Sequence, residues 1–327
     1  MRAWRVHENG EPERVLRLEE TEEPSPGPGE VLVGVEAVSL NFLDVLLCRR
    51  GYQERPEPPF VPGAEASGRV LAAGPETGIE PGGRVVVLTR PEGAFAERVA
   101  VPAERVFPVP EEMPPEKAAA LPIAYQTAHF ALHRRAGLEP GETVLVHAGA
   151  GGVGSAAIQL ARAADARVIA TAGSERKLGI CRELGADLAV DYRRQDVIGV
   201  VKEATGGRGA DVVFDPVGGD VFDASRRCVA FEGRLLVIGF AGGRIADAPT
   251  NHVLLKNYSV VGVHWGLYQS VMPGLVREVH EELLRLYASG EIDPLIGDSV
   301  SFEELPAALA RLGAGRTVGK VVARVGA

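Results

Sequence analysis

A glycine-rich turn in the middle of the chain carries the residue types best suited to binding a nucleotide. A short apolar run ends at Val146, and between Gly149 and Gly154 the sequence reads G-A-G-G-V-G before a helical pattern begins. The spacing G-x-G-x-x-G between a strand and a helix is typical of dinucleotide binding, because glycine permits the tight turn, the close approach of a pyrophosphate and the packing of the helix. The first N–H groups of that helix then face the phosphates. The predicted cofactor contacts in the turn are Gly149, Gly151, Gly152, Val153 and Gly154.

The end of the second predicted strand indicates which dinucleotide binds. NAD-binding chains usually place an acid roughly 20 residues after the first glycine, where it accepts a hydrogen bond from the ribose 2′-hydroxyl. Here the strand runs into Gly173 without an acid, and Ser174, Arg176 and Lys177 follow. A hydroxyl and a cation suit a 2′-phosphate, so the predicted cofactor is NADPH, held by Ser174 and Lys177. Arg176 fits a solvated helix turn equally well, and an inward Glu175 would oppose the phosphate.

The composition argues against several other classes of function. The 327 residues carry a net charge of −9 with acids and bases interspersed, which is unlike a general nucleic-acid or membrane-surface binder. Three widely spaced cysteines and no C-x-x-C motif indicate neither a disulfide framework nor a zinc knuckle. The first residues lack the apolar core of a signal peptide, and no apolar run reaches the roughly 18 residues of a membrane span. We therefore expect a cytoplasmic protein that acts on a small molecule.

The elements that must position these side chains form two patterns. Residues 1–124 read as short strands separated by Gly/Pro turns, which is typical of a barrel-like β domain. One helix is predicted at Phe42–Arg50, with Asn41 as its N-cap. The predicted strands are Ala3–Val6, Val15–Glu19, Val31–Ser39, Ala66–Ala73, Arg84–Leu88, Ala94–Ala100 and Arg105–Pro108.

From Thr143 onward, strands and helices alternate, which indicates a parallel sheet covered on both faces. The predicted strands are Thr143–His147, Arg167–Ala172, Leu188–Asp191, Asp211–Asp215, Arg234–Gly239 and Tyr258–His264. The predicted helices between them are Gly152–Ala164, Glu175–Leu184, Gln195–Thr205 and Gly219–Val229. Helical patterns at Pro114–Leu121 and Ile123–Ala136 precede this part of the chain.

The end of the chain is too short for a third domain. Helices are predicted at Met272–Ala288 and Phe302–Arg311, followed by a strand at Lys320–Arg324, and we expect this tail to return to the N-terminal domain. The apolar strand Tyr258–His264 is expected at a sheet edge, where it invites pairing with another chain. A homodimer is therefore expected, unless the C-terminal helix covers that edge.

Four segments resemble the zinc-free quinone oxidoreductase (ζ-crystallin-like) branch of the medium-chain dehydrogenase/reductase superfamily. They are NFLD at 41–44, PGAEASG at 62–68, HAGAGGVG at 147–154 and RTVGKVV at 316–322. The resemblance covers essentially the whole chain. It implies an α/β fold with a doubly wound Rossmann sheet and a GroES-like β-barrel-type catalytic domain. The implied domains are a catalytic domain at 1–124, completed by 266–327, and an NADPH-binding domain at 125–265.

The resemblance also implies roles for residues outside the glycine turn. Tyr192 matches a position near the adenosine phosphate, Gly239 and Phe240 lie where the chain passes the nicotinamide, and Lys320 is a candidate for the phosphate end or the cleft. The implied catalytic candidates are Asn41, Tyr52 and Thr127. Alternatives remain for each type of residue: Asn41 as a helix cap, Tyr52 or Tyr192 as a surface aromatic, and Thr127 as an ordinary helix residue.

The chain departs from the zinc alcohol dehydrogenases where their metal ligands stand. Ser39 and Ala64 take the places of a cysteine and a histidine, and Thr89–Glu97 has no cysteine. A zinc site needs three or four such ligands, so no metal is expected. The predicted function is zinc-independent transfer of reducing equivalents from NADPH to a quinone or related electron-poor carbonyl. A 2-alkenal, enone or enoyl-thioester reductase is the alternative, and a non-catalytic NADPH-binding protein is a further one.

Overall fold

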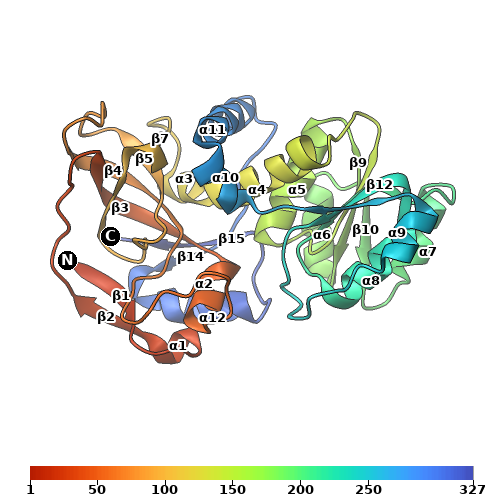
Figure 1. Cartoon of the computed structure of the whole chain (residues 1–327), viewed down its shortest axis with the longest axis horizontal. Coiled ribbons are helices and arrows are strands. Elements are labelled where there is room, and N and C mark those ends of the chain that lie inside the picture. Colours follow the sequence, from red (N-terminus) through yellow and green to blue (C-terminus); the bar gives the residue numbers. More distant parts are fainter. Residues whose placement is uncertain (327) are drawn as a thin grey trace. The chain divides into compact units, whose positions relative to one another are not determined.

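The computed structural model describes residues 1–326, and its contacts divide the chain into two units. Unit 1 comprises Met1–Ile123 together with the chain from Pro294 onward, and unit 2 comprises Ala124–Asp293. The N-terminal strands and the chain beyond residue 293, at the very end of the colour bar in Figure 1, therefore belong to the same unit. None of the helices in residues 1–326 combines the length and apolarity that crossing a membrane requires.

Unit 1 is built on a seven-stranded sheet. Six of its strands follow the order β14-β15-β3-β4-β5-β7, and the seventh, β6, pairs with β3. A separate hairpin joins β1 to β2. Valine, leucine and phenylalanine side chains from these strands fill its core, as β-branched and aromatic residues do in sheets. The strands are β1 (Arg2–Val6), β2 (Leu16–Glu20), β3 (Glu30–Leu40), β4 (Glu65–Ala73), β5 (Arg84–Leu88), β6 (Arg98–Pro102), β7 (Val106–Pro108), β14 (Ile296–Ser301) and β15 (Lys320–Arg324).

Short helices and turns accompany the strands of unit 1. They are α1 (Pro12–Val15), α2 (Phe42–Cys48), the 3-10 turn η1 (Ala103–Arg105), α3 (Pro115–Ala120), the 3-10 turn η4 (Phe302–Glu304) and α12 (Leu305–Gly313). α3 buries Ala119 and Ala120 against Ala37 of β3 and Val322 of β15. Small side chains at these four positions let the helix lie close to the sheet.

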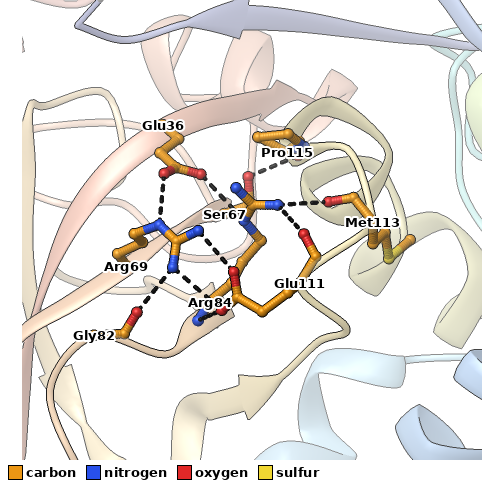
Figure 2. A network of polar contacts seen from close by, with 8 residues as sticks. All are labelled: Glu36, Ser67, Arg69, Gly82, Arg84, Glu111, Met113 and Pro115. Atoms are coloured by element: carbon orange, nitrogen blue, oxygen red, sulfur yellow. Dashed lines mark hydrogen bonds and ion pairs between the residues drawn. The ribbon is translucent and has the colours of Figure 1, made fainter.

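A polar network fixes the chain that leads into α3. Glu65, Ser67 and Arg69 share one face of β4, because alternate residues of a strand point the same way. Ser67 donates to the carbonyl of Pro115 at 2.7 Å, and Arg84 of β5 donates to the carbonyls of Glu111 and Met113 at 2.6 and 3.0 Å. Figure 2 shows these bonds together with the ion pairs of Glu36 to Arg69 and Arg84 and of Glu111 to Arg69.

Unit 2 contains a six-stranded sheet with the order β10-β9-β8-β11-β12-β13, in which every neighbouring pair is parallel. Counted within the unit, this is the order 3-2-1-4-5-6 of the doubly wound dinucleotide-binding fold, so the predicted fold class is confirmed. The strands are β8 (Thr143–Val146), β9 (Arg167–Ala172), β10 (Leu188–Asp191), β11 (Ala210–Asp215), β12 (Val229–Val237) and β13 (Ser259–Gly262).

The helices of unit 2 connect these strands and follow them (Figure 1). They are α5 (Gly152–Ala163), α6 (Glu175–Glu183), α7 (Val197–Ala204), α8 (Gly219–Cys228), α9 (Thr250–Lys256), α10 (Trp265–Val271) and α11 (Pro273–Ala288). The unit begins in a helical segment made of η2 (Pro122–Gln126), α4 (Thr127–His129) and η3 (Phe130–Arg135), in which η2 and η3 are π-helical turns.

The contacts divide the chain at a different point from the one expected. Residues 266–293 group with unit 2 rather than with the returning tail. Tyr268 of α10 packs on Phe130 with ring centroids 4.5 Å apart, and the backbone of Asp293 is held by Tyr125 and Gln159. These contacts place α10 and α11 with the parallel-sheet unit.

Two strand predictions also need correction. The predicted strand Ala94–Ala100 begins instead at Arg98, because Phe95 bonds outside the sheet, to the backbone of Trp4 and Pro62. β14 was not predicted, since its sequence IGDSVS contains a glycine and an aspartate and lacks a strong apolar alternation. Its parallel pairing with β15 makes it a strand.

Candidate functional site

The glycine turn has the geometry that its sequence predicts. Gly149 donates to the carbonyl of Thr171 at 2.9 Å, and α5 begins at Gly152 with Gly151 as its N-cap. A Cβ on Gly154 would lie 2.3 Å from the carbonyl oxygen of Ala148, and one on Gly149 would lie 2.9 Å from Cβ of Ala170. Neither position therefore accepts a side chain. The first N–H groups of α5 have no carbonyl partner within their own helix, which suits them to bind an anion.

His147 connects the start of the turn to β9 and to α8. Its Nε2 lies 2.8 Å from Oγ of Ser225, and its Nδ1 lies 3.1 Å from Oγ1 of Thr171. Ser225 donates its own proton to the carbonyl of Val221, so the histidine must be the donor on Nε2 and the acceptor on Nδ1. Burial lowers the pKa of His147 to about 4. His147 is thus a neutral structural link, and its contacts give it no catalytic role.

A cluster of cationic side chains lies at the ends of β9 and β10. Ser174 caps α6, Lys177 is half-buried, and burial together with the nearby Arg193 and Arg176 lowers the pKa of Lys177. Tyr192 is 52% exposed, and the Arg193 guanidinium lies 5.9 Å from its ring centroid. Because like charges gather here, the cluster is suited to a doubly charged phosphate.

The cation cluster explains why position 173 is a glycine, and it includes one residue, Arg193, that was not among the predicted cofactor contacts. A Cβ on Gly173 would lie 2.6 Å from the hydroxyl of Tyr192 and 3.0 Å from Nε of Arg193, so glycine lets β9 and β10 end side by side. Glu175 forms an ion pair with Arg182 at 3.1 Å. Arg193 was not predicted, although it directly follows Tyr192 in the sequence.

Loops after β11 and β12 bring the remaining cofactor candidates of unit 2 to the same edge of the sheet. Asp215 is buried and accepts from the N–H groups of Val217 and Gly218, both at 2.9 Å. A Cβ on Gly218 would lie 3.0 Å from Cδ1 of Phe240, and one on Gly239 would lie 3.4 Å from the carbonyl of Pro216. Phe240 is 36% exposed. These positions follow the carboxyl ends of parallel strands, where open α/β sheets bind ligands. Thr127 is half-exposed on α4.

In unit 1, Asn41 precedes α2 as predicted, and its side chain is held from two sides. Its backbone N–H donates to Asp44 at 2.8 Å, which is one half of a capping box. Its Nδ2 donates to Oε1 of Glu65 at 2.9 Å, and its Oδ1 accepts from Nζ of Lys320 at 2.6 Å.

Lys320, a candidate for the phosphate end or the cleft, is buried among acceptors of unit 1. The residue is 3% exposed, and its ammonium also donates to Oε1 of Glu65 at 3.0 Å and to the carbonyl of Leu40 at 3.4 Å. Three acceptors inside unit 1 match the three donors of an ammonium. Lys320 consequently binds Asn41 and Glu65 in this structure.

Tyr52 has a cationic neighbour that the sequence did not indicate. The Arg90 guanidinium lies 5.0 Å from the Tyr52 ring centroid and forms an ion pair with Glu54. The charge of Arg90 also reaches Asp44, whose pKa burial raises to about 7 against the opposing effects of the Asn41 N–H, Lys320 and Arg90. Asn41, Asp44, Tyr52 and Arg90 thus belong to one electrostatic neighbourhood in unit 1.

The donor set does not fit a zinc ion. Among residues 1–326 no group of three or more His, Cys, Asp or Glu side chains is arranged to hold a metal. Glu65, the one acid at the positions where the zinc dehydrogenases bind metal, already accepts from Asn41, Lys320 and the Ile123 N–H. All three cysteines are buried, and burial raises the pKa of each thiol.

Comparison with known proteins identifies the family to which the chain belongs. A family model described as "Zinc-binding dehydrogenase" matches residues 152–281, and one described as "Alcohol dehydrogenase GroES-like domain" matches residues 27–111. "Quinone oxidoreductase-like protein 2" of Bos taurus is 40% identical over 324 residues, which is 98% of this chain and 92% of that protein.

Two solved structures contain NADPH. The structure of the mycobacterial protein Rv1454c complexed with NADPH is 34% identical, has a TM-score of 0.92, and is matched over 99% of both chains. The Escherichia coli quinone oxidoreductase complexed with NADPH is 28% identical with a TM-score of 0.92, and the match covers 99% of this chain and 100% of that one.

Proposed function

The chain belongs to the medium-chain dehydrogenase/reductase superfamily, in its quinone oxidoreductase branch, and we propose that it is a zinc-independent, NADPH-dependent reductase of quinones or related electron-poor carbonyls. The observation that carries this proposal is the phosphate-binding edge of unit 2. The glycine turn, which is suited to a pyrophosphate, follows β8. The cation cluster follows β9 and β10, which are the next two parallel strands of the same sheet. NADPH-containing structures of relatives support the choice of cofactor.

The residues of unit 2 would hold the cofactor at both ends. The N-terminus of α5 receives the pyrophosphate, and Ser174, Lys177, Tyr192 and Arg193 receive the 2′-phosphate. Gly239, Phe240 and Thr127 remain candidates for the nicotinamide side, as the family resemblance implies. When bound, NADPH supplies the hydride, so the protein needs to orient the reactants and stabilise the charge that develops on the acceptor oxygen.

Tyr52 and Arg90 are the candidate donors to that oxygen. Because the Arg90 guanidinium lies over the Tyr52 ring, the two side chains together offer a phenol proton and a positive charge to an oxyanion. Arg90 pairs with Glu54, which lies in the same loop as Tyr52, and its backbone carbonyl accepts from Arg105. An acceptor with a planar conjugated carbonyl fits this chemistry.

An acceptor screen tests the proposal. NADPH oxidation is followed with a quinone, a 2-alkenal and an enoyl thioester, with NADH in parallel. Turnover of the quinone with NADPH preferred supports the proposal, whereas turnover of only the enal or the thioester replaces the quinone by that class. Tight NADPH binding without turnover of any acceptor identifies a non-catalytic NADPH-binding protein. Activity that disappears with a chelator and returns with zinc contradicts the zinc-independent mechanism.

A further inference from the structure

The loops that follow β11 and β12 are joined through their backbones. Each loop leaves the carboxyl end of its strand, and the two strands are neighbours in the parallel sheet. Residues 215–218 and 238–243, which we call the paired loops, therefore form one structural piece. Three hydrogen bonds run from N–H groups of the second loop to carbonyls of the first: Ile238 to Asp215 at 3.0 Å, Ala241 to Pro216 at 3.1 Å, and Gly242 to Val217 at 2.9 Å.

The side chain of Asp215 anchors the paired loops to the end of β11. The residue is 1% exposed, and its Oδ1 accepts from the N–H groups of Val217 and Gly218, both at 2.9 Å. Burial raises the pKa of Asp215, and the two N–H bonds oppose that rise. Because both donors lie within three residues of Asp215, the carboxylate fixes the direction in which the chain leaves the strand.

Gly218 connects the turn to Phe240. Its φ of +71° lies in the left-handed region that glycine adopts readily. A Cβ at this position would lie 3.0 Å from Cδ1 of Phe240 and 3.3 Å from the carbonyl oxygen of Arg244, so the turn packs directly against the second loop. The Arg244 guanidinium also forms ion pairs with Asp220 and Asp223 of α8. The Phe240 side chain is thus held on the side of Gly218, and its exposed part is open to a ligand.

We propose that Asp215 is a positioning residue that, through Gly218, sets the place of the Phe240 ring for the nicotinamide end of the cofactor. The inference rests on the proposed function and deepens it. The cation cluster follows β9 and β10, on one side of β8, and the paired loops follow β11 and β12, on the other side. A dinucleotide whose pyrophosphate lies at the turn after β8 therefore extends toward both. Removal of the Asp215 carboxylate should weaken contacts of the nicotinamide end alone.

Two ligands separate the ends of the cofactor in a binding experiment. NADPH has both ends, whereas adenosine 2′,5′-bisphosphate keeps the adenosine and the 2′-phosphate but lacks the nicotinamide. Calorimetric titration gives the Kd of each. Asp215→Ala is expected to weaken NADPH binding about tenfold and adenosine 2′,5′-bisphosphate binding less than about twofold. Equal weakening of both ligands, or no weakening of NADPH, overturns the proposal.

Asp211 provides a matched control on the same strand. It lies at the opposite end of β11, and its Oδ2 accepts from the Thr143 N–H at 2.7 Å. Asp211→Ala therefore removes the same kind of bond, and it is expected to leave the ratio of the two Kd values within about twofold of the natural ratio. A selective loss of NADPH binding in this control overturns the proposal, because the effect would then belong to the strand and not to the loop.

The conservative variant Asp215→Asn tests whether the two N–H bonds carry the effect. An amide oxygen still accepts from the N–H groups of Val217 and Gly218. Asp215→Asn is therefore expected to bind NADPH within about threefold of the natural Kd. A loss as large as that of Asp215→Ala overturns the positioning role.

Gly218→Ala keeps the proposal testable if Asp215→Ala fails to fold. This variant leaves the carboxylate in place but puts a Cβ against the Phe240 ring. We expect the same selective weakening of NADPH, and the melting midpoint of each variant is recorded beside its Kd values. An unchanged ratio of the two Kd values overturns the proposal. If the natural chain binds neither ligand, the first titrations show it, and the proposed function fails before any variant is compared.

Discussion

At the scale of single residues, we propose that Lys177 and Arg193 distinguish a 2′-phosphate from a 2′-hydroxyl. The two cations come from neighbouring strand ends, and burial together with repulsion from Arg193 lowers the pKa of Lys177. A phosphate relieves that repulsion, whereas a hydroxyl does not. Selectivity for NADPH therefore depends on this cluster more than on the glycine turn, which contacts groups that both cofactors share.

We expect Lys177→Met to raise the KM for NADPH about tenfold to a hundredfold, because one charge-assisted hydrogen bond is lost. The KM for NADH should change by less than about threefold. Initial rates with both cofactors measure this difference. Arg182→Met is the matched control, since Arg182 lies on the same helix but pairs with Glu175 at the surface. An equal rise of both KM values would show that Lys177 does not contact the 2′-phosphate.

His147 gives the stability of the protein a pH dependence that can be isolated. Its pKa is about 4 in the fold against 6.5 as its ordinary value, so the unfolded chain binds the extra proton first. The stabilisation by neutral His147 is complete above about pH 6.5 and is lost as the pH falls toward 4, by at most about 1.4 kcal/mol per pH unit. Asp44, with its raised pKa, changes stability in the opposite direction over this range.

A comparison of the natural chain with His147→Gln isolates the contribution of His147 to the pH dependence of stability, because both proteins share every other titratable group. We expect the variant to be less stable at pH 7 but to lose less stability than the natural chain between pH 6.5 and 4.5. Urea unfolding at several pH values measures this. Parallel pH profiles for the two proteins would contradict the neutral buried histidine.

At the scale of elements, β4 controls the placement of α3 through one face. Two polar side chains on this face bind the two ends of the α3 segment. Ser67 donates to the Pro115 carbonyl, and Glu65 accepts from the Ile123 N–H. Arg84, on the neighbouring strand, adds two bonds to the chain just before the helix (Figure 2). Since α3 is short, these side-chain contacts and the packing of its alanines hold it more than its own hydrogen bonds do.

We expect Arg84→Met to destabilise the protein by about 1–3 kcal/mol, because the carbonyls of Glu111 and Met113 lose a charged donor. Arg69→Met is the matched control in the same network. Arg69 is 39% exposed on its side chain against 14% for Arg84, so its ion pairs are better screened and its replacement should change the unfolding midpoint little. Chemical denaturation of both variants provides the measurement. Equal losses of unfolding free energy would contradict the role of Arg84 as the donor that holds the chain before α3.

The sequence predicted those elements whose signals are local. The glycine turn, the alternation of strands and helices after Thr143, and the absence of an acid after β9 are each read within a few residues. β14 was missed because pairing with β15 creates it. The partners of Lys320 could not be predicted for the same reason: they lie 279 and 255 residues away, and only the folded sheet brings them together.

At the scale of the whole molecule, the open edge of the unit 2 sheet suggests how copies associate. β13 ends the strand order, and its residues are exposed or half-buried. Just before it, α9 exposes Leu254 and Leu255 by 74% and 79%. A free strand edge beside exposed leucines favours self-association, so the homodimer remains our prediction.

Light scattering is expected to give about twice the mass of one chain. Leu254→Glu/Leu255→Glu should shift the protein to the mass of a single chain, because the paired acids cannot be buried at an interface. Leu71→Glu is the control, since Leu71 is also exposed, by 46%, but lies on β4 of unit 1. A natural chain that scatters as a monomer would remove the prediction.

The discontinuity of unit 1 has a consequence for biosynthesis. β15, from the last part of the chain to be translated, lies between β14 and β3 in the sheet, so the first 123 residues lack two strand partners while the ribosome is still reading the middle. The parallel-sheet unit is continuous and can fold as soon as it emerges. Until the final segment arrives, residues 37–40 of β3 lack their β15 partner and are open to wrong pairing, whereas residues 30–34 pair with β6. A nascent chain of this protein is therefore expected to need chaperone protection at its beginning rather than at its middle.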